Sequence, residues 1–242
     1  MNLRRLFGRK EETPTCAAVI VAGGSSQRMG TDKLMMNLGE LPVLVRTLRA
    51  FQTSAYVEEI VVVTRTEKLE QVAALVKEHH LDKVSRVVCG GKTRAESALA
   101  GVSEVNHKAR LIAIHDAARP LVTEDVILRA VYAARDYHAA VPAVKSTDTL
   151  KAVDEMGFVV GTVDREATVR VQTPQVFSAD LIKGALTKAV KDGLAITDDC
   201  SAIERMGVRC KTVLGDEDNI KITTPRDLVL AKAILKNRGE IL

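Results

Sequence analysis

The first chemically suggestive feature is a glycine-rich turn, Ala22, Gly23 and Gly24, followed by two cations, Arg28 and Lys33. Paired glycines at the end of a strand let backbone N–H groups turn inward, where they can bind phosphate oxygens. Positioned cations are what a transfer reaction at phosphorus requires. The segment is neither a Walker A loop nor a dinucleotide fingerprint. The glycines alone would suit a tight strand–helix connection equally well.

A second feature is Asp116, which follows an apolar run and precedes Pro120. An aspartate just past the end of a strand is well placed to contact a metal or a ribose. A turn-capping aspartate before a proline is the alternative interpretation. We interpret the neighbouring His115 as a packed strand residue rather than as a base.

Three further polar clusters occur later in the chain, at residues 162–165, 172–175 and 218–223. Taken singly, each charge in them suits a solvated surface. No serine–histidine or cysteine–histidine arrangement accompanies them. This does not count against an enzyme, because an attacking phosphate with its second pKa near 6 is already largely dianionic at neutral pH and needs no general base.

Composition limits the class of partner. The chain has 242 residues, 35 basic and 31 acidic side chains, 3% aromatic residues and no tryptophan. This small excess of positive charge and the lack of stacking residues predict no nucleic-acid partner. No apolar stretch is long enough for a membrane span. Four cysteines without zinc-site spacing predict reduced thiols and a cytoplasmic protein.

Short apolar runs alternate with amphipathic stretches, which predicts the elements that must position these residues. Continuous apolar runs suit strands covered on both faces. The alternation predicts an α/β fold, a three-layer αβα sandwich with a mostly parallel sheet, in which ligands bind beyond the carboxyl ends of the strands. We expect a flexible leader over residues 1–14 and a single domain over 15–238. The predicted strands are 16–22, 60–64, 84–89, 111–115 and 139–144.

Residues 146–170 interrupt this pattern. Threonines and valines alternate with polar residues around a turn signal at residues 154–157, which predicts a β arm projecting from the sheet. A surface excursion and a dimerisation device are equally compatible with the pattern.

The last predicted helix has a strong start signal. Thr224 suits the N-cap, Pro225 the first helical position and Asp227 the third. Leu228, Ala231 and Leu235 would then form its buried stripe.

Together the motifs carry a resemblance to known families. The first strand, double glycine, Arg-Met-Gly and nearby lysine resemble the signature loop of the sugar-nucleotide pyrophosphorylase superfamily. The whole run from Ala17 to about Leu235 is similar to the 2-C-methyl-D-erythritol 4-phosphate cytidylyltransferase family. The similar segments are 115–120 (HDAARP), 162–165 (TVDR), 172–175 (QTPQ), 197–199 (TDD) and 218–223 (DNIKIT).

The resemblance implies a fold and a reaction. The fold would be a Rossmann-like α/β domain whose β arm interlocks a homodimer. The reaction would join CMP from CTP to 2-C-methyl-D-erythritol 4-phosphate, a polyol phosphate, with release of pyrophosphate and with Mg²⁺ as the divalent metal. This reaction belongs to the non-mevalonate synthesis of isoprenoid precursors.

The resemblance also implies roles for residues. Arg28 and Lys33 match the pair that stabilises the transition state. The residues that match substrate-positioning residues are Arg165, Lys221, Thr149 and Arg119. Those that match nucleotide-binding residues are Ala22, Gly23, Gly24, Gly91, Arg94, Ser97 and Asp116. Metal binding would fall on Asp116 and Asp218. Arg165 would serve the neighbouring subunit's site.

Two departures from the family pattern leave alternatives open. Lys33 follows Arg28 after only four residues, a spacing closer to the guanylyltransferases of molybdenum cofactor assembly. Lys92 stands where the cytidylyltransferase family often has an acidic residue in the segment that binds cytosine. A relative acting on ribitol 5-phosphate, a guanylyltransferase and a catalytically silent nucleotide-binding domain are the other hypotheses.

Overall fold

The computed structural model describes residues 13–24 and 32–241. Its centre is a sheet in the order β10-β7-β11-β6-β1-β4-β5, with β12 paired to β7. These strands are β1 (Cys16–Val21), β4 (Val57–Thr64), β5 (Val84–Cys89), β6 (Leu111–Asp116), β7 (Ala139–Lys145), β10 (Val169–Val171), β11 (Gln175–Ser178) and β12 (Lys211–Leu214).

The sheet is mostly parallel. Strands β5, β4, β1 and β6 pair in parallel, as do β7 and β12. Strand β11 runs antiparallel between β6 and β7, and β10 is antiparallel to β7. The carboxyl ends of β1, β4, β5 and β6 therefore lie at one edge of the sheet, where an α/β protein binds its ligands.

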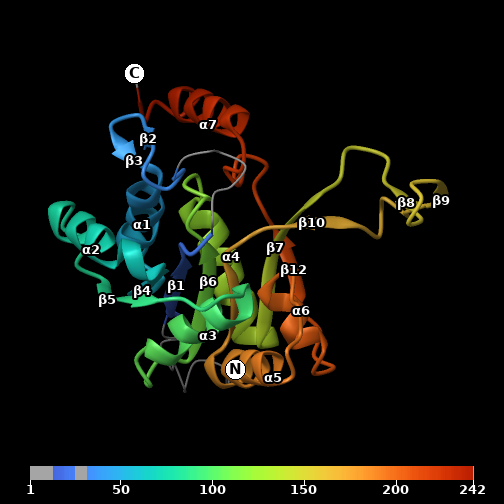
Figure 1. Cartoon of the computed structure of the whole chain (residues 1–242), viewed down its shortest axis with the longest axis horizontal. Helices are drawn as coiled ribbons and strands as arrows, with labels where there is room; N and C mark the ends of the chain where they lie inside the picture. The colour runs from blue at the N-terminus through green and yellow to red at the C-terminus, as the bar shows by residue number, and fades with distance from the viewer. Residues whose placement is uncertain (1–12, 25–31, 242) are drawn as a thin grey trace, which may run out of the picture.

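Helices cover both faces of this sheet (Figure 1). Along β1, Ala18 and Ile20 point to one core and Val19 to the other. This alternation explains the continuous apolar run, because both sides of the strand are buried. The helices are α1 (Val43–Thr53), α2 (Leu69–Glu78), α3 (Arg94–Glu104), α4 (Glu124–Tyr137), α5 (Ala179–Lys191), α6 (Asp199–Glu204) and α7 (Pro225–Asn237), with a 3-10 turn η3 (Thr66–Lys68).

The two cores differ in the helices that they contain. The larger core packs α1, α4 and α7 on the sheet, and the smaller one packs α3, α5 and α6. The three-layer αβα architecture predicted from the sequence is confirmed. Among the described residues, no helix combines the length and apolar character needed to cross a membrane. The predicted leader over residues 1–14 lies largely outside the described residues.

Local capping sets where two of the helices begin. Helix α7 has Thr224 as its N-cap, with a reciprocal hydrogen-bond box to Asp227 and Pro225 at the first position, as the sequence predicts. Helix α3 begins with the same device, Thr93 and Glu96. Its first turn, which carries Arg94 and Ser97, is fixed at the edge of the sheet where ligands are expected.

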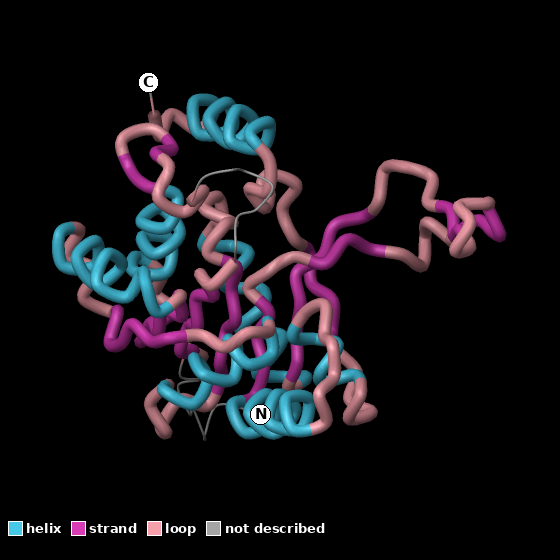
Figure 2. The backbone as a smooth tube through the Cα atoms, in the orientation of Figure 1, coloured by secondary structure: helices cyan, strands magenta, loops and turns pink. Residues whose placement is uncertain are grey.

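The predicted arm is present and projects from the body. Two short strands, β8 (Lys151–Val153) and β9 (Val159–Thr162), pair antiparallel at its tip, and Figure 2 shows loops joining this tip to the sheet. Asp154 closes the turn by accepting hydrogen bonds from the backbone N–H groups of Met156 and Phe158. A second small hairpin, β2 (Asn37–Leu38) and β3 (Leu41–Pro42), precedes α1.

Candidate active site

A pocket of about 390 Å³ opens at the carboxyl ends of the strands. Several separate segments of the fold contribute to it: the turn after β1, the residues at Lys33 and Leu34, the start of α3, the end of β6, the segment before α6 and the loop after β12. Nine of the residues predicted from the sequence line it: Ala22, Gly23, Gly24, Lys33, Gly91, Arg94, Ser97, Asp116 and Lys221. Residues almost 200 positions apart in the chain thus converge on one cavity, as expected for the edge of a parallel sheet.

Glycine is required at position 90, where the segment before α3 packs against the first turn of that helix. A Cβ added at Gly90 would lie 2.7 Å from Oγ of Ser97, so a larger residue would displace that serine. Ser97 is buried and its hydroxyl donates to the carbonyl oxygen of Thr93 at 2.9 Å. Among the described residues, a Cβ added at Gly24 would meet no atom within 4 Å. The turn after β1 therefore leaves open space beside its backbone, as binding of a ligand there requires.

Asp116 lies at the electrostatic centre of the pocket. Its carboxylate pairs with Nζ of Lys221 at 2.9 Å, Nε of Arg119 at 3.6 Å and Nη2 of Arg94 at 3.8 Å. Burial alone would raise the pKa of Asp116, but Lys221, Arg94 and Arg119 together hold it well below its usual range. Three cations around one ionised carboxylate leave a local positive excess that suits an anionic ligand.

Arg94 is also held by a second carboxylate. Its Nη2 donates to Asp199 at 2.7 Å, and Asp199 is fully buried at the start of α6. Burial raises the pKa of Asp199 to about 6. Nη1 of Arg94 and Oδ1 of Asp199 are buried without a hydrogen-bond partner among the described residues. The guanidinium thus keeps an unused donor beside the cavity that it lines.

A buried polar network lies behind Asp116. The hydroxyl of Thr173 accepts a hydrogen bond from the backbone N–H of Asp116 at 3.1 Å and donates to Nδ1 of His115 at 3.0 Å. This assignment leaves the proton on Nε2 of His115, which donates to the carbonyl oxygen of Arg119 at 3.1 Å. Burial lowers the pKa of His115 to about 4. His115 is a packed, neutral strand residue, as the sequence predicts, and it fixes the loop that carries Asp116.

The other predicted site residues lie elsewhere. Arg119 does not line the pocket but reaches it through Asp116. Thr149 and Arg165 are exposed and belong to the arm. Asp218 is turned toward Arg238, at 3.2 Å. Arg28 lies outside the described residues, and those residues contain no group of three histidine, cysteine or acidic side chains able to hold a metal.

Sequence reasoning missed two residues that shape the site, Asp199 and Thr173. Both belong to segments that the sequence marks as motifs, but neither was given a role of its own. The signal for Asp199 was its place after Thr197 and Asp198 at a helix start, which normally suggests capping. Asp198 performs that capping, because it accepts from the N–H of Ser201. Asp199 is left to face Arg94, a partner 105 positions away.

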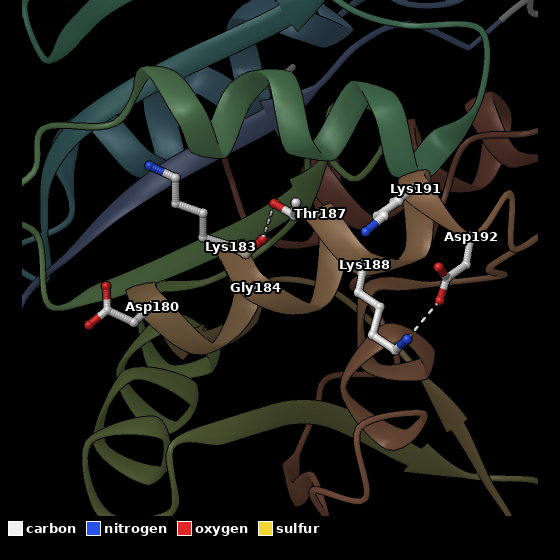
Figure 3. A pocket seen from close by; sticks show the side chains of 7 residues that line it. All are labelled: Asp180, Lys183, Gly184, Thr187, Lys188, Lys191 and Asp192. Carbon is white, nitrogen blue, oxygen red and sulfur yellow. Dashed lines mark hydrogen bonds and ion pairs between the residues drawn. The ribbon is translucent and has the colours of Figure 1, made fainter.

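A second depression, shown in Figure 3, lies on the surface of α5. All of its lining side chains come from this one helix and its C-cap. They contain an ion pair between Lys188 and Asp192 at 2.8 Å. None of them belongs to the pocket at the strand ends, so we assign it no part in the chemistry.

Comparisons with known proteins show the family to which the chain belongs. The family model for 2-C-methyl-D-erythritol 4-phosphate cytidylyltransferase matches residues 16–237. The chain belongs to this family. The enzyme of that name from Caldanaerobacter subterraneus subsp. tengcongensis is 43% identical over 91% of this chain and 98% of its own length. The one from Symbiobacterium thermophilum is 44% identical over 92% of this chain and 94% of its own.

Solved structures of cytidylyltransferases show the same fold. The 4-diphosphocytidyl-2C-methyl-D-erythritol synthase of Anaerococcus prevotii superposes with a TM-score of 0.83 at 30% identity, covering 93% of this chain and all of that one. The 2-C-methyl-D-erythritol 4-phosphate cytidylyltransferase of Thermus thermophilus gives 0.74 at 30% identity, covering 92% and 99%. The predicted family, fold class and enzyme class, a nucleotidyltransferase of isoprenoid precursor synthesis, are confirmed.

The first prediction concerns the neutral state of His115. Its folded-state pKa of about 4 lies below the ordinary value of 6.5, so the folded protein binds fewer protons than the unfolded chain between these pH values. The contribution of the neutral His115 ring to the free energy of unfolding is therefore fully present above pH 6.5. It is lost as the pH falls from 6.5 through 4. Between pH 7 and pH 5 this loss is about 2 kcal/mol. An asparagine at this position would stay neutral, and its amide oxygen could still accept from Thr173.

Denaturant unfolding of the wild type and of His115→Asn at both pH values checks this. Asp199 titrates in the opposite direction over the same range, since its pKa is raised, and its effect is common to both proteins. We expect the wild type to lose about 2 kcal/mol more than the variant on acidification. An equal loss in the two proteins would contradict a buried neutral imidazole.

Proposed function

We propose that this chain joins CMP from CTP to 2-C-methyl-D-erythritol 4-phosphate, giving 4-diphosphocytidyl-2-C-methyl-D-erythritol and pyrophosphate. The family assignment supports this reaction. The observation that carries it is the single pocket in which Lys33 and Lys221 meet the glycine turn after β1 and the capped start of α3. Cations and backbone donors of this kind suit a triphosphate and a second phosphate.

The nucleotide base is assigned to the start of α3. Cytosine presents one amino donor and two acceptors, which backbone groups near Gly91 and the hydroxyl of Ser97 can match. In this proposal a larger purine would clash where cytosine fits. A buried polar group that lost its partner here would cost about 1–3 kcal/mol. The unused donor of Arg94 is a further group available to the nucleotide.

The triphosphate is assigned to the turn at residues 22–24 together with Lys33. A phosphate oxygen of the acceptor attacks the α-phosphorus, and the bond from that phosphorus to the bridging oxygen of pyrophosphate breaks. The electron pair leaves with pyrophosphate. The acceptor phosphate is already largely dianionic near neutral pH, so no side chain has to remove a proton. Lys33 and Arg28 would act by stabilising charge on the transferring group.

The residues present fit a magnesium ion as the cofactor. Mg²⁺ is usually held by one or two carboxylates together with substrate phosphates and water. Asp116 supplies an ionised carboxylate that lines the pocket. When bound, Mg²⁺ would neutralise negative charge on the phosphate oxygens. Asp218, the second ligand that the resemblance implies, pairs with Arg238 and does not line this pocket.

The acceptor is assigned to a site shared by two subunits. Arg119 and Lys221 gather around Asp116, whereas Thr149 and Arg165 lie exposed on the arm. The tip of that arm also exposes large apolar side chains: Val153, Met156, Phe158, Val159 and Val160. Exposed apolar clusters of this kind mark interaction sites. A homodimer through the arm would cover them and bring the arm's Arg165 to the partner's pocket.

We place the enzyme in the cytoplasm. All four cysteines are free thiols, which suits a reducing compartment. The proposed donor, CTP, is a substrate of that compartment.

The reaction can be tested with purified protein, Mg²⁺ and a coupled assay of pyrophosphate release. We expect release with CTP and 2-C-methyl-D-erythritol 4-phosphate, and at least a tenfold lower kcat/KM with GTP in place of CTP or ribitol 5-phosphate as acceptor. Higher kcat/KM with ribitol 5-phosphate would replace the proposed acceptor. Higher kcat/KM with GTP would favour a guanylyltransferase.

Lys33 provides a test of charge stabilisation. We expect Lys33→Ala to lower kcat by at least about tenfold, because one cation near the transferring phosphorus is lost. Lys191→Ala, which removes an exposed lysine of α5, is the matched control and should leave kcat unchanged. Unchanged kcat in Lys33→Ala would remove Lys33 from the proposed machinery.

The shared site predicts complementation between two weak variants. Arg165→Ala should mainly raise KM for the polyol phosphate, and Lys33→Ala should lower kcat. In an equal mixture that has exchanged subunits, half of the dimers are mixed, and each mixed dimer has one intact site. We therefore expect about a quarter of wild-type activity. A mixture whose activity equals the mean of the two variants would show that each chain builds its site alone.

A further inference from the structure

Arg238, at the end of α7, reaches back to two loops of the active-site edge. Its Nη1 donates to the carbonyl oxygen of Leu121 at 3.1 Å. Its Nη2 lies 3.2 Å from the carboxylate of Asp218 and 3.5 Å from that of Asp216. The side chain is only 23% exposed. Figure 1 shows α7 lying beside the β2–β3 hairpin rather than among the strands, so this contact comes from outside the sheet.

The two loops carry Lys221, which lines the pocket, and Arg119, which pairs with Asp116. Asp116 ends β6 and is followed by residues 117–123, which contain Arg119, and residues 215–223 follow β12 and contain Lys221. The loops meet directly where the guanidinium of Arg119 donates to the carbonyl oxygen of Asn219 at 2.7 Å. They meet again where the N–H of Ile222 donates to the carbonyl oxygen of Ala118 at 2.8 Å. The pair between Lys221 and Asp116 depends on this juxtaposition.

We propose that Arg238 is a positioning residue, which holds the loop of Lys221 against the loop of Asp116 and Arg119. Among the described site residues predicted from the sequence, its one ion-pair partner is Asp218, which was predicted as a metal ligand. Its effect on turnover rests on the proposed function, whereas its effect on the position of the loop does not.

The chemistry of arginine fits this task. A planar guanidinium offers donors in several fixed directions, so one side chain can bind a carbonyl oxygen on one loop and carboxylates on another. A lysine ammonium is a compact charge on a flexible stem and keeps less of this geometry. Isolated surface ion pairs contribute little to stability. Here, however, three acceptors converge on the guanidinium of Arg238, which is mostly buried.

This contact also bears on Asp218. A carboxylate that accepts from Arg238 holds the loop, and the same oxygen is then not directed at a metal. The two roles make different predictions. If Asp218 acts with Arg238, removal of either residue disturbs the same loop, and the two substitutions are not additive. If Asp218 binds Mg²⁺, its removal raises the Mg²⁺ concentration needed for activity and removal of Arg238 does not.

Hydrogen exchange followed by mass spectrometry tests the position of the loop without any substrate. We expect Arg238→Gln to speed exchange at least about threefold in peptides covering residues 215–223. Arg238→Lys should give a smaller increase. Lys236→Gln, an exposed neighbour on α7, is the control and should change nothing. Exchange that is unchanged in Arg238→Gln, or faster over the whole chain alike, would overturn the proposal.

Steady-state kinetics test the consequence. Arg238→Gln should raise KM for the polyol phosphate about fivefold or more, with less than about a twofold change in KM for CTP. Asp218→Asn should do the same, the double variant should be no worse than either, and the Mg²⁺ requirement should stay unchanged. Additive effects, or a raised Mg²⁺ requirement in Asp218→Asn alone, would overturn the assignment. A wild-type enzyme inactive with this acceptor would refute the proposed function, and the exchange data would still decide the role of Arg238.

Discussion

Asp116 binds three cations that arrive from three different parts of the chain, and this ion cluster sets the geometry of the pocket. Arg94 comes from the start of α3, Arg119 from the loop after β6, and Lys221 from the loop after β12. Without the carboxylate, these cations would repel one another at a partly buried site. With it, they stay close together and still present a net positive charge to a ligand. The cluster thus prepares an anion site before any anion is bound.

The buried network behind Asp116 must be polar and yet carry no charge of its own. The network of His115, Thr173 and Asn219 meets this requirement, because each is neutral and fully or almost fully buried. Asn219 donates to the carbonyl oxygen of Thr173 at 2.9 Å, so the loop of Lys221 is tied to the same threonine that holds the backbone of Asp116. A charged group in this place would compete with Asp116 for the three cations. The neutral network instead fixes positions without altering the charge balance.

Much of this could be predicted from the sequence because it depends on local patterns. Apolar runs marked the strands, and their carboxyl ends marked the region of the pocket; Thr224, Pro225 and Asp227 marked the start of α7. The pairing of Arg94 with Asp199, and of Arg238 with Asp218, could not be predicted in the same way. These contacts join residues far apart in sequence, and each depends on the exact turn of two loops. Asp218 illustrates the limit: its motif suggested a metal ligand, and its side chain lies against an arginine that no motif contained.

The position of the arm has a consequence for how the activity is assembled. Within one chain, the nucleotide side of the pocket is lined by the described residues predicted for it, whereas Thr149 and Arg165 lie on a projecting hairpin. An arm that folded back onto its own pocket would bury its apolar tip against a site made for anions, which is unfavourable for both surfaces. In the proposed dimer, a second copy of the chain would offer the tip an equivalent apolar surface, and the arm's arginine would lie at the partner's acceptor site. In the proposed dimer, burial of the tip and completion of the acceptor site are therefore the same event, and activity should depend on protein concentration wherever the dimer dissociates.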